Sequence, residues 1–247
     1  MINMLSSSIF SFPKDESREN QDAVLYPKKL PNGYLMAVAD GVGGYKGGKE
    51  ASSEVISYLS QLNDDIKDVD LDDIFFNMKR NVTSLSSKDG SLYSAATTIT
   101  FCYVNNDHVI IGHSGDCRLY FKQDKKLKQI TKDHTQHQIL IDKGMYTARQ
   151  LKNAPGGNVI TTAISAKIVL EYQIICIPKN ELPLESGKLT LFIMSDGAHH
   201  FWEKRPRFSP NTLASPSRFS SSLQKRIENL GATDDYSLLS ACIHFES

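Results

Sequence analysis

The stretch TTITFCYVNNDHVIIGHSGDCRLYFKQDKKLKQIT, residues 97–131, decides the fold class. Its β-rich runs are separated by short polar turns, and they lie at 97–104, 108–113, 118–122 and 127–131. Connections this short join antiparallel neighbours, because parallel strands need a crossover of a dozen or more residues. The stretch therefore predicts an antiparallel sheet and excludes most β-α-β architectures.

Further elements are predicted on both sides of this stretch. Apolar residues at helical spacing and the flanking turn residues predict helices over 51–62, 71–85, 135–143 and 223–230. Additional strands are expected at 22–26, 34–39, 159–163, 169–177, 189–194 and 236–245. No internal repeat or long linker divides the chain, so we expect residues 1–247 to form one α+β domain.

Composition excludes several classes of protein. Lys plus Arg and Asp plus Glu balance at 28 each, which argues against a nucleic-acid-binding protein with a strongly basic surface. No apolar run approaches the roughly 18 residues of a membrane span, and the start MINMLSSSIFSF lacks the pattern of a signal peptide. The cysteines are scattered without a C-x-x-C pair. We expect a cytoplasmic protein that binds neither nucleic acid nor membrane.

A glycine-rich stretch, LMAVADGVGGYKGGK at 35–49, ends an apolar strand on Asp40 and leads into a helix. Such a turn suits either a metal ion or a phosphate group. Residues 43–49 fit the G-x-x-x-x-G-K half of a phosphate-binding loop, but Glu50 stands where Ser or Thr would ligate magnesium. A carboxylate there would repel phosphate, and such loops belong to parallel sheets. We therefore favour a metal site.

Four further carboxylates repeat this design at a strand end or a tight turn, and they are Asp22, Asp116, Asp196 and Asp234. One of them alone would be typical of a solvated turn or a helix cap. Carboxylates and backbone carbonyls are the hard oxygen ligands that magnesium and manganese prefer. Several of them together would hold a pair of ions, and a two-metal site clamps an in-line phosphoryl displacement.

In chain order, six motifs resemble those of the metal-dependent protein phosphatases of the 2C type: RENQDA (18–23), VADGVGG (38–44), SAATT (94–98), GHSGDCR (112–118), SDG (195–197) and DDYS (234–237). The motifs span nearly the whole chain. The resemblance implies a four-layer α-β-β-α sandwich, in which helix pairs flank two antiparallel sheets. It also implies a single, bacterial-like catalytic domain that is monomeric.

By that resemblance, Asp40 bridges two Mn²⁺ or Mg²⁺ ions and the Gly41 carbonyl ligates one of them. Asp196 and Asp234 complete the ligands of the other ion, and Asp22 holds or orients metal-bound water. The implied reaction is hydrolysis of phosphoserine or phosphothreonine in proteins by a hydroxide that bridges the ions. The expected partners are phosphorylated proteins, among them a cognate serine/threonine kinase or its substrates.

The sequence departs from the family pattern at four positions, one of which is Thr162, where many bacterial relatives have an arginine. Arg18 is taken as the catalytic, phosphate-binding arginine, although it lies four residues before Asp22 where the family usually has five. Val42 replaces a histidine that many eukaryotic relatives carry as a proposed general acid. His200 stands where the family places an acidic partner of Asp116 for a third metal ion; imidazole is softer, so a third ion should bind weakly or not at all. A phosphatase-like regulatory or phosphoprotein-binding module with little turnover therefore remains the second hypothesis.

Overall fold

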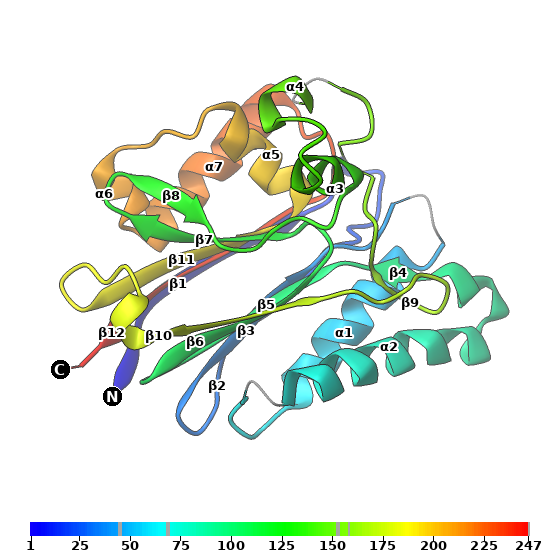
Figure 1. Cartoon of the computed structure of the whole chain (residues 1–247), viewed down its shortest axis with the longest axis horizontal. Helices are drawn as coiled ribbons and strands as arrows, with labels where there is room; N and C mark the ends of the chain where they lie inside the picture. The colour runs from blue at the N-terminus through cyan, green and yellow to red at the C-terminus, as the bar shows by residue number, and fades with distance from the viewer. Residues whose placement is uncertain (44–45, 68–69, 152–153, 158, 247) are drawn as a thin grey trace.

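The computed structural model describes residues 1–43, 46–67, 70–151, 154–157 and 159–246, so Gly44 of the glycine-rich stretch lies outside the described residues. Two antiparallel sheets stack face to face (Figure 1). In spatial order, the first sheet comprises β10 (Gln173–Pro178), β6 (His108–Ser114), β5 (Ile99–Asn105), β3 (Gly33–Ala39) and β2 (Ala23–Lys29). The second comprises β1 (Ile2–Phe12), β12 (Tyr236–Phe245), β11 (Lys188–Met194), β7 (Arg118–Gln123) and β8 (Lys126–Gln129).

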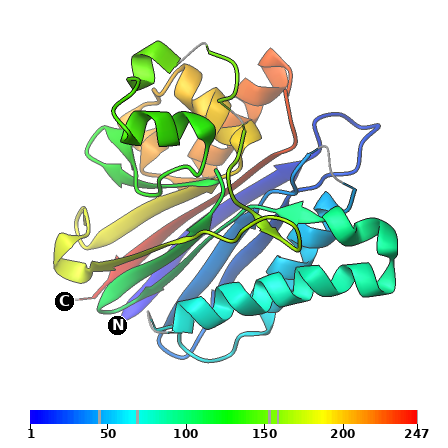
Figure 2. The ribbon, with the colours of Figure 1, turned by 45° about the vertical axis from the view of Figure 1, so that its right-hand side comes forward.

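Helices cover the outer face of each sheet, as Figure 2 shows from a second direction. The first sheet is covered by α1 (Gly48–Gln61) and α2 (Leu71–Lys88), and the second by α5 (Asp196–Lys204) and α7 (Pro216–Leu230). The remaining elements are η2 (Gly90–Ser94), β4 (Ala96–Thr97), α3 (Gln136–Asp142), α4 (Ala148–Leu151), β9 (Ile164–Ser165), η3 (Lys179–Glu181) and α6 (Pro210–Leu213). The predicted α-β-β-α sandwich is confirmed.

Strand β3 shows why the layers form. Leu35 and Ala37 pack against α1 and α2, while Met36 and Val38 belong to the core between the two sheets. Side chains alternate between the faces of a strand, so a wholly apolar strand is buried on both sides. The residues of β3 therefore place it centrally, between the helices and the opposite sheet.

The strand expected at 169–177 begins only at Gln173, as β10, and two larger differences concern the N-terminus and residues 159–163. Residues 2–12 form β1, an edge strand paired with β12, although the sequence analysis assigned no strand there. Residues 159–163 were expected to form a strand, and that prediction is wrong apart from an isolated bridge between Thr135 and Ile160. There the Thr162 hydroxyl replaces a strand ladder, because it bonds the backbone of Val169 and Glu171.

The connections that carry the predicted acidic residues meet at one end of the sandwich, opposite both chain termini (Figure 1). Strand β3 ends at this end and β2 begins there, since the two strands are antiparallel neighbours. Strands β11 and β12 are related in the same way. Within the described residues, no helix is both long enough and apolar enough to cross a membrane.

Candidate metal centre

Asp40 follows β3 directly, and its backbone is fixed by the neighbouring chain. The Asp40 carbonyl accepts hydrogen bonds from Thr98 N and Thr97 Oγ1, each at 2.8 Å. The next residue must be glycine, because a Cβ at Gly41 would lie 2.5 Å from the backbone of Gly48. The glycines therefore let the start of α1 pack against the turn that carries Asp40.

Asp22 and Ser195 link the two sheets at the same end. Ser195 Oγ donates to Asp22 Oδ2 at 2.8 Å and accepts from Ser237 N at 2.9 Å. Asp22 itself precedes β2 and is buried. The Asp22 carboxylate is therefore held from the opposite sheet by a hydroxyl that precedes α5.

Asp196 and Asp234 are brought together by a close backbone approach. Asp196 is the first residue of α5, and Asp234 lies just before β12. A Cβ at Gly197 would lie 2.0 Å from the Asp235 carbonyl oxygen, so only glycine lets the helix start touch this loop. The Asp-Gly sequence at 196–197 is therefore required by packing as well as by chemistry.

A hollow of about 270 Å³, here called the acidic cleft, is formed where these segments meet; its lining includes Asp40, Gly41, Asp116, Asp196 and Asp234. Asp22 does not line it but acts on Asp40 through its charge. Among the described residues, no group of three or more Asp, Glu, His or Cys side chains is arranged as a ready metal cage. Apart from Asp22, the predicted ligands of the two ions therefore line one cleft, but their side chains are not arranged around a single metal position.

Burial and mutual repulsion shift the acidic groups of the cleft. Burial, followed by the charges of Asp22, Asp196 and Asp116, raises the pKa of Asp40 well above its usual range. Burial is also the largest cause that raises the pKa of Asp22 to about 7 and that of Asp196 to about 6, the latter with a contribution from the charge of Asp234. The cleft therefore disfavours its own ionised carboxylates as long as no cation shares their charge.

The donor set fits a pair of hard divalent ions. Across the described ranges, none of these carboxylates forms an ion pair with Lys, Arg or His. The Oδ1 atom of Asp22 is buried and has no hydrogen-bond partner there. Buried like charges are stable together only when protonated or neutralised, and carboxylate oxygens suit Mg²⁺ and Mn²⁺.

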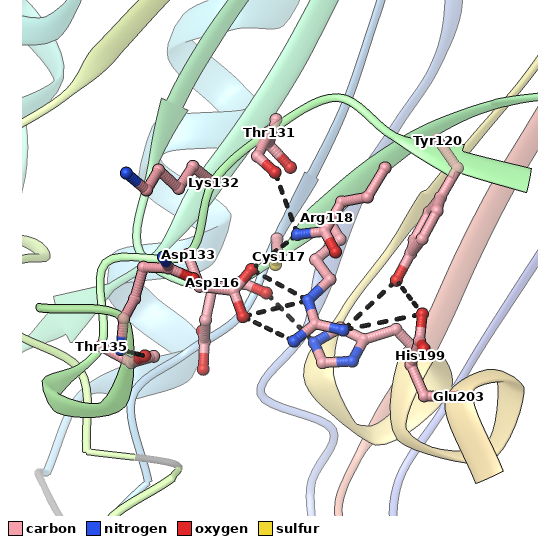
Figure 3. A network of polar contacts seen from close by, with 12 residues as sticks. Asp116, Cys117, Arg118, Tyr120, Thr131, Lys132, Asp133, Thr135, His199 and Glu203 are labelled. Atoms are coloured by element: carbon pink, nitrogen blue, oxygen red, sulfur yellow. Dashed lines mark hydrogen bonds and ion pairs between the residues drawn. The ribbon is translucent and has the colours of Figure 1, made fainter. Parts of the chain in front are cut away.

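A second hollow of about 410 Å³, here called the side hollow, adjoins the acidic cleft because Asp116, Asp196 and Asp234 line both. Within it, Arg118 donates from Nε and Nη2 to the carboxylate of Asp133 at 2.6–3.0 Å (Figure 3). This bidentate pair fixes the turn that carries Asp116 to the segment after β8.

Two adjacent histidines of α5 line the side hollow. His199 Nε2 lies 3.1 Å from the Asp116 carbonyl and donates to it, and burial lowers the pKa of His199 to about 3 (Figure 3). His200 is exposed and lies edge-on to the ring of Phe201. The structure therefore places His200 and Asp116 at the same hollow, the position the sequence suggests for a weak third ion.

Arg18 is the one predicted site residue that the structure places apart from the others. It lies in an exposed turn, where its backbone N donates to the Asp15 carbonyl at 3.2 Å. Within the described residues its side chain forms no hydrogen bond or ion pair, and it does not line the acidic cleft. The phosphate-binding role of Arg18 stays a prediction.

Sequence reasoning missed the groups that support the site. The Asp235 carboxylate accepts from the backbone N of Lys14 at 2.7 Å and of Gln21 at 2.8 Å, which fixes the segment before Asp22. Ser195 orients Asp22 in the same way. Both residues belong to quoted motifs, DDYS and SDG, but their partners are about 40 to 220 positions away in the chain. Only the fold reveals these contacts.

Comparison with known proteins decides the family. The family model for protein phosphatase 2C matches residues 14–241, which is most of the chain. The chain belongs to the protein phosphatase 2C family. The resemblance drawn from the motifs is therefore confirmed.

Members of the protein phosphatase 2C family with similar sequences are bacterial serine/threonine phosphatases. The chain is 33% identical over 135 residues to PstP of Mycobacterium tuberculosis, an alignment that covers 53% of this chain and 26% of PstP. It is 25% identical over 171 residues to the phosphatase stp of Listeria monocytogenes, covering 66% of each chain. The alignments thus span about a quarter and about two thirds of these relatives.

Solved structures of the same family share the fold over nearly the whole chain. A bacterial serine phosphatase superposes with a TM-score of 0.84 at 19% identity, covering 99% of this chain and 100% of that one. The catalytic domain of PstP, solved in complex with two manganese ions, gives a TM-score of 0.76 at 22% identity, with coverage of 99% and 100%. These matches establish the fold of this member of the protein phosphatase 2C family.

Proposed function

We propose that the chain hydrolyses phosphoserine and phosphothreonine in proteins, with two Mn²⁺ or Mg²⁺ ions in the acidic cleft. One observation carries the proposal: carboxylates from separate segments of the chain meet at one end of the sandwich, with pKa values raised by burial and by one another. Membership of the protein phosphatase 2C family and the two manganese ions of the similar PstP domain support it.

The residues of the cleft have distinct roles in this proposal. Asp40, the Gly41 carbonyl, Asp196 and Asp234 hold the ions, as the donor set of the cleft allows. Asp22, whose carboxylate is held by the hydroxyl of Ser195, would orient the attacking water. When bound, the ions would stabilise the charge of the phosphoryl group and acidify that water. Val42 carries no titratable group, so the proton for the leaving oxygen would come from a water molecule of the site.

A third ion would be held between Asp116 and His200. Both residues line the side hollow, and the neutral nitrogen donor at position 200 makes the site weaker than an all-carboxylate one. We therefore infer that two ions are sufficient for turnover.

We infer that the partners are phosphorylated proteins, among them a cognate serine/threonine kinase or its substrates, and that the chain acts as one monomeric catalytic domain in the cytoplasm. Cys102 and Cys117 are fully buried thiols, which agrees with a reducing compartment. Size-exclusion chromatography with light scattering tests the monomer, and a dimer at micromolar concentration would contradict it.

A second candidate, a phosphoprotein-binding module with little turnover, is favoured by the position of Arg18 alone. Its side chain does not line the cleft in which phosphate would be bound. This candidate predicts phosphopeptide binding without metal-stimulated release of phosphate. Turnover within the ordinary enzyme range of about 1–1000 per second would exclude it.

The direct test is manganese-dependent release of phosphate from a phosphothreonine peptide by the intact chain. Asp40→Asn and Asp196→Asn should each lower kcat by about a hundredfold or more, because each removes an ion ligand. Asp107→Asn is the matched control, since Asp107 is exposed in the β5–β6 turn. If both cleft variants keep full activity, the assignment of these carboxylates is wrong.

A further inference from the structure

Charge is distributed unevenly along this electrically balanced chain. Residues 204–227 contain no Asp or Glu, although the chain as a whole carries 28 acidic and 28 basic residues. The basic residues of this segment are Lys204, Arg205, Arg207, Arg218, Lys225 and Arg226. A run of 24 residues with positive charge only produces a local field that the net charge of zero conceals.

The fold brings most of these cations to one groove. An open groove of about 520 Å³ lies between the end of α5 and the last turns of α7, here called the basic groove. Its cations are Lys204, Arg205, Arg207, Lys225 and Arg226. No acidic residue lines it, and among the described residues none of its cations forms an ion pair. The basic groove therefore presents unneutralised positive charge.

Arg226 of the groove is held by hydrogen bonds within the protein, whereas the other four cations are exposed to solvent and could contact a ligand. Arg226 donates from Nη1 and Nη2 to the carbonyls of Phe201, Arg205 and Arg207 at 2.7–3.2 Å, which fixes the loop after α5. Lys204, Arg205, Arg207 and Lys225 are exposed. Arg226 therefore fixes the loop beside the groove, while the other four cations face solvent.

The floor of the basic groove is apolar. Lys204 Nζ lies 4.8 Å from the ring centre of Phe201, and the guanidinium of Arg226 lies 4.2 Å from that of Phe208. Leu230 at the edge is 63% exposed. A ligand for this surface combines negative charge with some apolar contact, as a peptide segment does.

The basic groove is connected to the acidic cleft by a single helix. Asp196 at the start of α5 lines the cleft, and Lys204 at its end lines the groove. At 1.5 Å per residue the two ends are about 12 Å apart, which an extended peptide spans with about four residues.

We propose that the basic groove docks an acidic segment of the phosphoprotein substrate, about four residues from the phosphorylated residue. This inference rests on the proposed phosphatase function. Charge complementarity supports it, since the ionisable residues that line the groove are all cations and an acidic segment supplies the opposite charge. A groove between two helix ends fits an extended chain better than a flat lipid surface, which would need several protruding apolar residues.

The test compares three substrates with manganese present: a phosphothreonine peptide with a run of glutamates beginning about four residues away, on either side; its glutamine counterpart; and p-nitrophenyl phosphate. The groove variant is Lys204→Glu/Lys225→Glu. The matched control is Arg80→Glu/Lys88→Glu on α2, which reverses the same charge on the opposite outer layer at exposed positions.

We expect the wild-type chain to prefer a glutamate peptide by about tenfold in kcat/KM, and this preference should fall as salt increases. The groove variant should lose the preference and keep its rate on p-nitrophenyl phosphate, while the control variant should keep both. Equal kcat/KM for glutamate and glutamine peptides, or an unchanged preference in the groove variant, would overturn the docking site.

Two further measurements separate the possible causes of failure. If no protein releases phosphate from any substrate, the proposed function fails. Fluorescence anisotropy then tests the docking site without catalysis. It compares binding of the labelled glutamate peptide to Asp40→Asn with binding to the same variant that also carries Lys204→Glu/Lys225→Glu, and equal binding to both would overturn the docking site. Phosphatidylserine-containing vesicles are the third arm: vesicle binding that the groove variant abolishes, with peptide binding unchanged, would also overturn the proposal.

Discussion

At the scale of single residues, the acidic cleft is a source of instability that ligand binding relieves. Asp40 sits among three other carboxylates, and together with burial they raise its pKa well above the usual range. Native contacts elsewhere hold these groups in place, as the hydrogen bond from Ser195 to Asp22 shows. A divalent cation would neutralise these mutually repelling carboxylates, and this relief would favour its binding.

The substitution Asp40→Asn should therefore stabilise the metal-free protein while it lowers turnover. Asparagine cannot ionise, so the substitution removes the cost of either protonating the Asp40 carboxyl or burying its charge, and it should raise the free energy of unfolding by about 1–2 kcal/mol near neutral pH. Urea denaturation in the presence of a chelator measures this, with Asp107→Asn as the control. A lower midpoint for Asp40→Asn would contradict the claim that this carboxylate destabilises the metal-free protein.

His113 predicts how stability responds to acid. It is fully buried, its ring lies 4.9 Å from that of His134, and burial lowers its pKa to about 3. The unfolded chain, with a histidine pKa near 6.5, binds this proton more readily than the folded one, so stability present above about pH 6.5 is lost as the pH falls towards 3.

The variant His113→Gln should make the free energy of unfolding less dependent on pH between about 6.5 and 3, by up to about 1.4 kcal/mol per unit. Denaturant titrations across this range test it, and His108→Gln on the same strand is the control. Parallel pH profiles for wild type and His113→Gln would contradict the assignment; His134 and Arg118 are the other charged or titratable groups that act on His113.

At the scale of elements, β7 is tied to the segment after β8 by the Arg118–Asp133 pair. The side chains of Arg118 and Asp133 are only 20% and 11% exposed. Removing Arg118 would leave Asp133 as a nearly buried charge, and removing Asp133 would leave Arg118 with the longer ion pair to Glu203, at 3.8 Å. We expect Arg118→Leu and Asp133→Leu each to cost about 3 kcal/mol of unfolding free energy, and the double variant to cost clearly less than the sum. Additive losses in thermal denaturation would show that the two charges act independently.

The elements also show what a sequence can and cannot predict. Strands with strong apolar patterns and short turns, such as β5 and β6, were predicted within one residue or two at their ends. Strand β1 was missed because its exposed edge carries serines and a bulge between Met4 and Ser6 interrupts the alternation. The segment 159–163 was wrongly predicted as a strand from its apolar residues; in the part of the chain that the structure describes, its one pairing is the isolated bridge from Ile160 to Thr135.

The candidate site likewise contains residues that the sequence could identify and contacts that it could not. Asp40, Asp116, Asp196 and Asp234 could be named because each lies in a short motif, and the fold does gather them at one cleft. Their supporting contacts could not be named, since Asp235 reaches Lys14 across 221 positions of the chain. Short motifs identify the candidate ligand residues, whereas the residues that hold them in place come from distant parts of the chain and are found only from the tertiary structure.

At the scale of the whole molecule, two sheets and their helices serve to bring distant segments to one end. The acidic cleft takes residues from both sheets, so the ions would bind across the sandwich. The basic groove lies at the other end of α5, so binding of the phosphoryl group and docking of the substrate would share one helix. The central claim is that the Asp40 carboxylate would be a ligand of both ions in this cleft.

Anomalous diffraction from crystals soaked in Mn²⁺ tests that claim most directly. We predict two manganese peaks in the acidic cleft, about 3.5–4 Å apart, both within ligand distance of the Asp40 carboxylate. An equivalent soak of Asp40→Asn should lose at least one peak. Crystals that show manganese elsewhere but none beside Asp40, at a concentration that supports phosphate release, would contradict the account.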